Sequence, residues 1–204
     1  MAKNTDAKRL RILEAAKKRF AHYGLAKTTM AEIAQDLTFS KALLYYYFPD
    51  KNSLYAAVLE MANEEVVQEC AAIIRDAADV MTAIENFLDV RLRIIKDNYN
   101  IFEFPFSLRN DMPVDLENIM PVLFEKQIQQ IRAILEKGIA TGELKPIDDL
   151  DLTAKLLQIS LLGMRVGVLK EYKNIFFPPS KEEFDYILTL QKKLAKIFID
   201  GLRK

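Results

Sequence analysis

The sequence predicts an all-α protein, and three observations support that class. Half of the 204 residues are hydrophobic, and they recur at helical spacing over long segments. Glycine and proline are scarce, with six and seven residues, and most of them fall between those segments, where they end helices. No segment of any length shows the strict alternation that is typical of a strand.

The first predicted helix covers residues 6–22, and Gly24 follows it as a stop signal. A second, short helix begins after Thr29, whose hydroxyl can accept a hydrogen bond from a free backbone N–H. Glu32, three residues later, completes a capping-box pattern. The apolar face of this helix consists of Met30, Ile33, Ala34 and Leu37.

A third helix is expected after Ser40, which is a good N-terminal cap. Leu44 and Phe48 lie four residues apart and should face inward. The side chains that should face outward are Lys41, Tyr45, Tyr46 and Tyr47. Two short helices, a brief turn and a polar, aromatic second helix are what a helix-turn-helix motif needs.

At these residues the sequence resembles the TetR family of bacterial transcriptional regulators. The family pattern reads T-x-x-x-I-A-x-x-x-G-V-S-x-x-x-x-Y-x-[HY]-F-x-x-K. It maps onto Thr29, Ile33, Ala34, Phe39, Ser40, Tyr45, Tyr47, Phe48 and Lys51, and the upstream helix fits through Ile12, Leu13, Ala16, Phe20 and Gly24. Thr38 replaces the turn glycine of the family. A side chain at a left-handed turn position costs roughly 1 kcal/mol.

The resemblance implies a three-helix helix-turn-helix DNA-binding domain at residues 1–50. A helical ligand-binding and dimerisation domain would then occupy residues 51–204. It also implies a ligand-responsive regulator, most often a repressor, that binds palindromic double-stranded DNA as a homodimer and is released by a small-molecule effector.

The charge distribution supports a nucleic-acid partner for the first domain only. The chain has no net charge, but residues 1–52 hold ten basic and five acidic side chains. Nineteen basic and twenty-four acidic side chains remain for the rest of the chain. A basic region on an acidic body suggests that only the basic region meets phosphate. A solvated basic helix is the alternative, and the helix-turn-helix pattern favours the DNA interpretation.

The remainder of the chain predicts further helices with clear boundaries. Pro121 is expected to break or kink the helix that Met112 and Pro113 open. Ser180 and Glu183 form a second capping-box pattern. The helices are expected over residues 51–75, 80–98, 112–138, 150–170 and 181–202. No flexible linker separates the helix that begins at Lys51 from the first domain.

The third helix should lie in the major groove with its N-terminal end nearest the bases. Lys41 can reach a phosphate or guanine, Tyr46 is the candidate specificity residue, and Tyr45 and Tyr47 resemble phosphate-contacting positions of the family. The tyrosines could alternatively form a small aromatic core. The complete set of DNA-binding candidates is Thr28, Thr29, Ser40, Lys41, Ala42, Leu43, Tyr45, Tyr46, Tyr47 and Lys51.

Aromatic and methionine side chains gather between residues 102 and 124. They are either ordinary core or the lining of an apolar ligand cavity, which the resemblance favours. The ligand-binding candidates, including the few polar groups that would orient a ligand, are Arg91, Tyr99, Phe102, Phe106, Met120, Phe124, Gln127 and Arg165.

The last two helices are expected to form the dimer interface. Gly163 and Gly167 lie four residues apart within an apolar segment. Each glycine lowers helix stability by up to about 1 kcal/mol, so the pair indicates that another helix packs closely here. The alternative is that both helices belong to the internal core of one chain. The resemblance, which implies a four-helix bundle across a two-fold axis, favours the dimer.

Other classes of function are less well supported. The single histidine, His22, and the single cysteine, Cys70, form no catalytic or metal-binding pattern, so no enzyme, cofactor or metal site is predicted. The absence of a leader and of an apolar run near 18 residues predicts a cytoplasmic protein without membrane contact. The rival interpretation is an all-helical protein-interaction module, which Thr38 and the zero net charge leave open.

Overall fold

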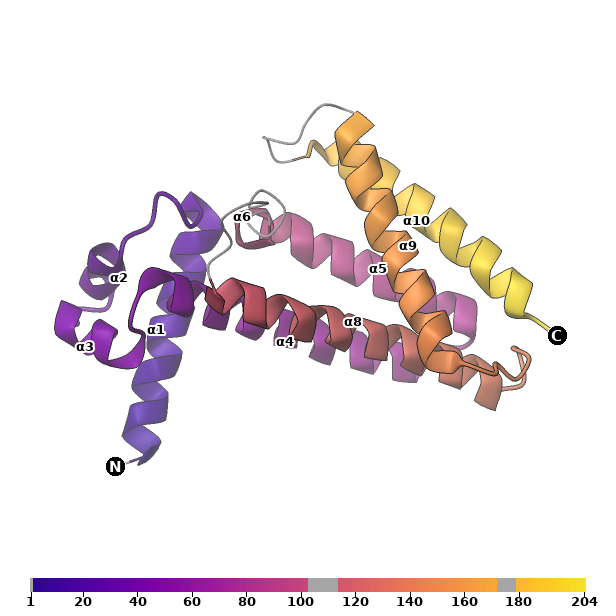
Figure 1. The fold of residues 1–204 in the computed structure, drawn as a ribbon, viewed down its shortest axis with the longest axis horizontal. Helices are drawn as coiled ribbons and strands as arrows, with labels where there is room; N and C mark the ends of the chain where they lie inside the picture. Colours follow the sequence, from indigo (N-terminus) through magenta and orange to yellow (C-terminus); the bar gives the residue numbers. More distant parts are fainter. Residues whose placement is uncertain (1, 103–113, 172–178) are drawn as a thin grey trace. The chain divides into compact units, whose positions relative to one another are not determined.

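A computed structural model describes residues 2–102, 114–171 and 179–204, and the side chains of residues 7–102, 114–168 and 179–204 within them. These residues are helical apart from short connections and one isolated β-bridge between Leu144 and Arg203. The predicted all-α class is therefore confirmed. The described chain divides into two compact units (Figure 1).

Unit 1 comprises residues 1–64 and 98–123, and unit 2 comprises residues 65–97 and 124–204. Two long helices contribute residues to both units. These are α4, which spans Lys51–Asp76, and α8, which spans Val114–Ala140. The division between the two compact units therefore falls inside both helices.

Unit 1 begins with three helices that match the predicted helix-turn-helix region. They are α1 (Ala2–Tyr23), α2 (Met30–Asp36) and α3 (Lys41–Tyr47). Their inward faces and the first turns of α4 share one apolar core, which includes the fully buried side chains of Ile12, Phe20, Ile33, Leu44 and Leu54. Burial of this face holds the short α2 and α3, because helices of seven residues are marginal on their own.

A short helix, α6 (Tyr99–Phe102), completes unit 1 and packs against α1. The buried hydroxyl of Tyr55 on α4 donates to the carbonyl of Ile101 at 2.5 Å. The Asn100 side-chain amide donates to the carbonyl of Ala21 at 2.8 Å. These two bonds fix α6 between α1 and α4.

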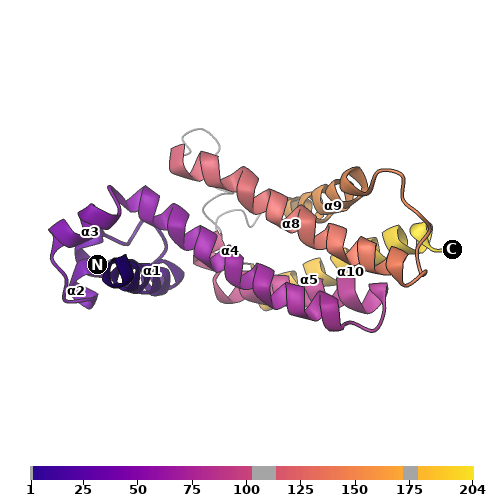
Figure 2. The ribbon, with the colours of Figure 1, turned by 90° about the horizontal axis from the view of Figure 1, so that it is seen from below.

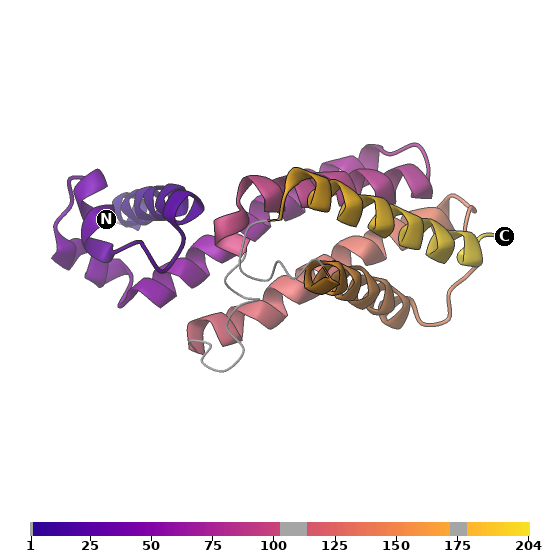
Figure 3. The same ribbon diagram turned by 90° about the horizontal axis from the view of Figure 1, so that it is seen from above.

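Unit 2 is a bundle in which α5 (Val80–Asp97) folds back along the second half of α4, as Figure 2 shows. Helix α10 (Lys181–Leu202) packs against both α5 and α9 (Leu150–Glu171) (Figure 3). Helices α5 and α10 each have a buried apolar face, which includes Phe87 and Leu88 on α5 and Phe184 and Ile187 on α10. The end of α10 is joined to the segment that follows α8, because the backbone N–H of Lys145 donates to the carbonyl of Leu202 at 2.9 Å.

Two sequence predictions about element boundaries have clear outcomes. Pro121 was expected to break or kink its helix, and helix α8 continues through it without a break. Proline removes a single backbone donor, and a helix of 27 residues tolerates that loss. The capping box at Ser180 and Glu183 is confirmed, since the Glu183 N–H donates to Ser180 Oγ at 3.2 Å and the Ser180 N–H donates to the Glu183 carboxylate at 2.6 Å.

Candidate functional sites

Helix α3 is seated by its cap and by two buried side chains. The N–H of Leu43 donates to Ser40 Oγ at 3.2 Å, as the capping pattern predicts. Leu44 is fully buried and Phe48 is 4% exposed, so the predicted inward face is confirmed. This anchoring leaves the rest of α3 turned toward solvent.

The outer surface of α3 is polar and aromatic. Tyr46 is 76% exposed and Tyr45 is 50% exposed, while Lys41 and Ala42 are also exposed. The rings of Tyr46 and Tyr47 meet edge to face with centroids 5.2 Å apart. Tyr45 and Tyr46 therefore lie outside the apolar core and present large amphipathic surfaces that could contact a duplex. Tyr47, which was expected to face outward, is instead partly buried and packs against the unit 1 core.

Three of the predicted DNA-binding side chains make contacts inside unit 1. Thr28 is fully buried, and its hydroxyl donates to the carbonyl of Gly24 at 2.8 Å. The Lys51 ammonium donates to the carbonyl of Leu25 at 2.8 Å. Thr29 caps α2. A DNA contact from Thr28 would therefore have to come from its backbone, and Lys51 would have to exchange its present partner.

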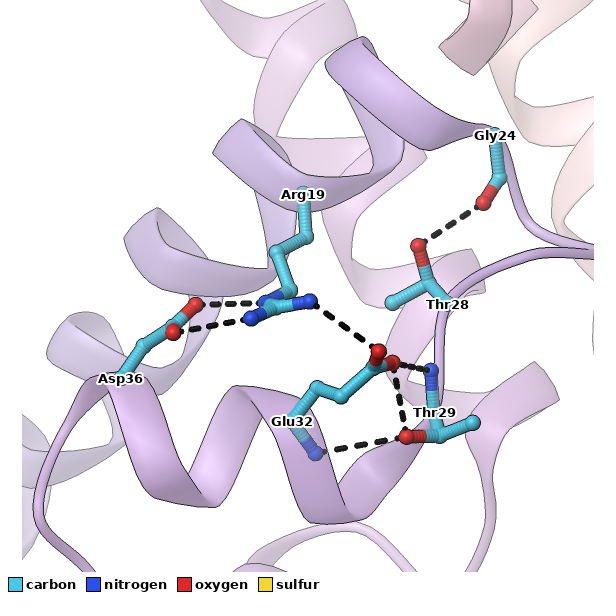
Figure 4. A network of polar contacts seen from close by, with 6 residues as sticks. All are labelled: Arg19, Gly24, Thr28, Thr29, Glu32 and Asp36. Carbon is cyan, nitrogen blue, oxygen red and sulfur yellow. Dashed lines mark hydrogen bonds and ion pairs between the residues drawn. The ribbon is translucent and has the colours of Figure 1, made fainter.

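The capping box of α2 belongs to a larger polar network, which Figure 4 shows. Thr29 N–H donates to Glu32 Oε2 at 2.9 Å, and Glu32 N–H donates to Thr29 Oγ1 at 3.3 Å. Arg19 from α1 binds both carboxylate oxygens of Asp36 at 2.5 and 2.9 Å, and its third nitrogen lies 3.5 Å from Glu32. Through Arg19, the network connects α1 to both Glu32 in the first turn and Asp36 at the last position of α2.

The same network explains two carboxylate pKa values. Hydrogen bonds from Thr29 hold the pKa of Glu32 below its usual range. The Arg19 guanidinium does the same for the pKa of Asp36. Sequence reasoning did not identify Arg19 and Asp36 as partners, because they lie on different helices and seventeen positions apart.

The turn between α2 and α3 has the geometry of a glycine-containing helix end. Thr38 has a φ of 54°, within the left-handed region. The N–H of Phe39 donates to the carbonyl of Ala34 at 2.9 Å, and the N–H of Thr38 donates to that of Gln35 at 3.1 Å. This pair of bonds is the Schellman motif, in which a left-handed residue follows the helix. Thr38 therefore adopts the conformation that the replaced glycine would have taken.

In unit 2, a second polar network joins three helices. Arg91 on α5 donates to Gln158 Oε1 on α9 at 2.9 Å and to Gln127 Oε1 on α8. The amide of Gln158 also donates to Gln127 Oε1, at 2.6 Å. Sequence analysis singled out Arg91 and Gln127 but not Gln158. The available signal was one glutamine inside the apolar segment LLQISLL of residues 156–162.

A small cavity adjoins this network within unit 2. Arg91 and Arg165 line it together with Gln191 from α10, and its apolar wall consists of Leu88, Leu92, Ile95, Leu161 and Leu162. Its free volume is about 10 Å³, which is room for about one water molecule. The cavity is therefore closed in this structure.

The remaining ligand candidates lie elsewhere. Phe124 is partly buried in unit 2, whereas Tyr99, Phe102 and Met120 belong to unit 1. Phe102 and Met120 pack against the unit 1 core. Phe106 lies outside the described residues. The structure therefore joins Arg91 to Gln127 by a hydrogen bond and places Arg91 and Arg165 at one cavity, whose lining includes none of the described aromatic candidates.

Helices α9 and α10 present apolar side chains to solvent. A side chain added at Gly163 or Gly167 would meet nothing within 4 Å, so both positions are open. The exposed side chains on these helices include Leu152 (61%), Leu156 (54%), Ile159 (48%), Tyr186 (43%) and Ile197 (72%). The two helices thus have an outward apolar face as well as an inward one.

Other chemistry finds little support among the described residues. They contain no group of three or more His, Cys, Asp or Glu side chains placed to hold a metal ion. Cys70 is buried as predicted, and its burial raises the pKa of the thiol to about 11, which makes it inert. None of the helices described combines the length and the apolar character that crossing a membrane requires.

A three-helix unit that presents an exposed recognition helix defines a helix-turn-helix DNA-binding regulator. The family model for bacterial regulatory proteins of the tetR family matches residues 12–58. A transcriptional regulator from Cytophaga hutchinsonii ATCC 33406 is 31% identical, with a TM-score of 0.81, over 95% of this chain and 97% of that one. The chain belongs to the TetR family of bacterial transcriptional regulators, which are not enzymes.

Two further relatives extend this comparison. YfiR of Bacillus subtilis (strain 168), an uncharacterized HTH-type transcriptional regulator, is 23% identical over 98% of this chain and 95% of its own. FadR from Bacillus subtilis, solved in complex with stearoyl-CoA, has a TM-score of 0.67 and 14% identity over 95% of this chain and 99% of its own. At that identity the likeness shows the shared fold alone.

Proposed function

We propose that the chain is a cytoplasmic repressor that binds a palindromic operator as a homodimer and is released by a small, largely apolar effector. The observation that carries the DNA-binding part is the outer surface of α3. Lys41, Tyr45 and Tyr46 are exposed there, while Leu44 and Phe48 lock the helix to its core.

The N-terminal end of α3 would approach the base edges. Lys41 would contact phosphate or the O6 and N7 atoms of guanine, and Ala42 and Leu43 would meet a thymine methyl group. Tyr46, the most exposed of the tyrosines, would contribute to specificity, with Tyr45 and Tyr47 donating to phosphate oxygens. Ser40 and Thr29 lie at helix starts, where backbone N–H groups favour an anion.

The outward apolar face of α9 and α10 supports the dimer. Gly163 and Gly167 are open to a close approach by another helix, and the flanking Leu156 and Ile159 are about half exposed. A symmetric pairing of this face would bury apolar surface that otherwise stays in water. Two recognition helices held roughly 34–36 Å apart could then read a palindrome.

Release would follow from a two-state equilibrium. An effector lowers the operator affinity if it binds more tightly to a state of the dimer in which the two recognition helices have the wrong spacing. The loss equals the difference between the effector's binding free energies for the two states, typically about 1–3 kcal/mol. Because α4 and α8 each contribute residues to both units, a rearrangement in the body can reach the DNA-binding region along continuous helices.

Selection from a random pool of duplex DNA by the purified protein at near-physiological salt tests this function. We expect one inverted repeat to be enriched. Binding to that repeat should weaken steeply with salt, and Lys41→Ala should reduce the salt slope by about one counterion. Lys145→Ala, which removes an exposed lysine far along the chain from α3, is the matched control and should leave the slope unchanged.

Failure to enrich any sequence from a folded, dimeric sample would contradict the DNA-binding proposal for the isolated protein. Enrichment of a single half-site without a repeat would instead contradict the symmetric dimer. Salt-insensitive association with a protein partner, unchanged by Lys41→Ala, would favour the protein-interaction interpretation.

A further inference from the structure

Arg91 is a partly buried cation whose partners are all neutral. Its guanidinium donates to the side-chain oxygens of Gln158 and Gln127, and its carbon lies 5.8 Å from the centre of the Phe87 ring. The two glutamines are themselves joined, since Gln158 Nε2 donates to Gln127 Oε1. Among the residues that the structure describes, no carboxylate takes part in this network.

Other cations of the same unit contrast with Arg91. Arg93, two residues further along α5, pairs with Glu69, and Lys192 on α10 lies 2.7 Å from a carboxylate oxygen of Asp89. A charge that is partly removed from water needs compensation more than one that is exposed. Arg91 is thus partly removed from water and has neutral partners, whereas Arg93 and Lys192 each have a carboxylate partner.

Arg165 brings a second guanidinium to the same cavity. It is only 8% exposed, and it lines the cavity together with Arg91. Loss of water around Arg91, with a smaller contribution from the charge of Arg165, lowers the pKa of Arg91 to about 10. Arg91 therefore stays charged at neutral pH and brings a positive charge to the cavity.

We propose that this cavity receives an anionic group of the effector, a carboxylate or a similar oxyanion, on the guanidinium of Arg91. The inference rests on the proposed function and narrows the class of effector that unit 2 takes. The planar fork of arginine matches two oxygens of one oxyanion, and such charge-assisted bonds are stronger than those to neutral amides. Arg165 lies beside the same site as the second cation.

The apolar part of the cavity lining defines the rest of the effector. It consists of Leu88, Leu92, Ile95, Leu161 and Leu162, which offer only apolar surface. An effector with an acidic head and an apolar body would match both the arginines and this apolar lining. The effector class is therefore an amphipathic acid rather than a neutral apolar molecule.

The size of the cavity links binding to conformational change. Its free volume of about 10 Å³ holds no more than about one water molecule. An amphipathic acid thus binds a state in which α5, α9 and α10 lie further apart. Such a ligand stabilises that open state at the expense of the closed one, which is the population shift that release from an operator requires.

Thermal unfolding of the full-length protein tests the inference without DNA. The probes are straight-chain carboxylates from acetate to dodecanoate, the neutral amides of the same chain lengths, and inorganic phosphate and chloride. We expect the longer carboxylates to raise the unfolding temperature through mass action on the folded state. Each amide should raise it less than its matching carboxylate.

Substitutions assign the effect to the cavity. Arg91→Met should weaken carboxylate binding about tenfold or more, the loss typical of a charged hydrogen bond. Arg93→Met is the matched control, because it removes an exposed arginine from the same helix, and it should leave binding unchanged. Arg91→Lys keeps the charge without the fork and should bind with intermediate affinity, so it serves as a second variant if Arg91→Met does not fold.

The possible outcomes are distinct. Equal stabilisation by amides and carboxylates would overturn the anionic head group, and no stabilisation by any probe would overturn the site. Stabilisation by phosphate or chloride that the longest carboxylate does not exceed would keep an anion at Arg91 and overturn the apolar body. The DNA selection tests the proposed function independently of these ligand measurements. A negative ligand result therefore does not contradict DNA binding, and a negative DNA selection does not contradict the anion site.

Discussion

The helix-turn-helix region and the polar interior of unit 2 are built in opposite ways. The recognition surface is assembled within one short segment, in which Ser40 caps α3 and Leu44 anchors it four residues later. The Arg91 network takes single side chains from α5, α8 and α9, which are separated by up to 67 positions in sequence. A substitution in the helix-turn-helix region should therefore disturb one short segment, whereas a substitution in the Arg91 network should disturb the packing of several helices at once.

Leu44→Ala gives the largest expected effect and tests how strongly the stability of the helix-turn-helix region depends on one buried side chain of α3. Leu44 is fully buried, so the substitution leaves a cavity and should destabilise unit 1 by about 2–5 kcal/mol. Denaturant unfolding followed by helical circular dichroism measures the loss. Tyr46→Ala, on the exposed face of the same helix, should change stability by no more than about 0.5 kcal/mol. Equal losses in the two variants would contradict the assignment of faces.

Gln158→Leu tests the opposite construction in unit 2. Gln158 is fully buried and holds both Arg91 and Gln127, so its loss leaves a charged donor without one acceptor. We expect a destabilisation of about 1–3 kcal/mol. The control Gln129→Leu removes an exposed glutamine of α8 and should have little effect.

The double variant Arg91→Met/Gln158→Leu sharpens this test. If the network acts as a unit, the double variant should lose less unfolding free energy than the two single variants lose together. The reason is that the Gln158 acceptor is no longer needed once the Arg91 donor is gone. Strictly additive costs would contradict a coupled network.

The two capping boxes allow the same change in both regions. Thr29→Ala should cost about 1 kcal/mol at α2, and Ser180→Ala a similar amount at α10. Amide hydrogen exchange should show faster opening confined to the first turns of the altered helix. Only Thr29→Ala should also weaken DNA binding, because α2 supports α3. Loss of DNA binding in Ser180→Ala would contradict a purely local effect.

The same contrast explains what the sequence could predict. Caps, helix stops and the inward spacing of Leu44 and Phe48 depend on neighbours within a few residues, so their prediction succeeded. The pairing of Arg19 with Asp36 and of Arg91 with Gln158 depends on how helices pack, and no local signal specifies it.

Thr28 and Lys51 add a different lesson. Both occupy positions where a DNA contact was predicted, and both side chains bond to backbone carbonyls of the α1–α2 turn instead. Residue type and helix position are compatible with either role. Only the surrounding backbone decides between them.

Thr38→Gly gives the smallest expected effect, and it restores the turn glycine of the family pattern between α2 and α3. Thr38 adopts a φ of 54° to complete the Schellman motif. Glycine takes that conformation without the steric cost of a side chain, so the substitution should stabilise unit 1 by up to about 1 kcal/mol. Part of the gain is offset because glycine loses more conformational entropy on folding. Unfolding measurements should show this gain while the selected DNA sequence stays the same, because Thr38 only closes the turn. A destabilised Thr38→Gly variant would mean that the Thr38 hydroxyl, which donates to the carbonyl of Leu37 at 2.6 Å, contributes more than the left-handed backbone costs.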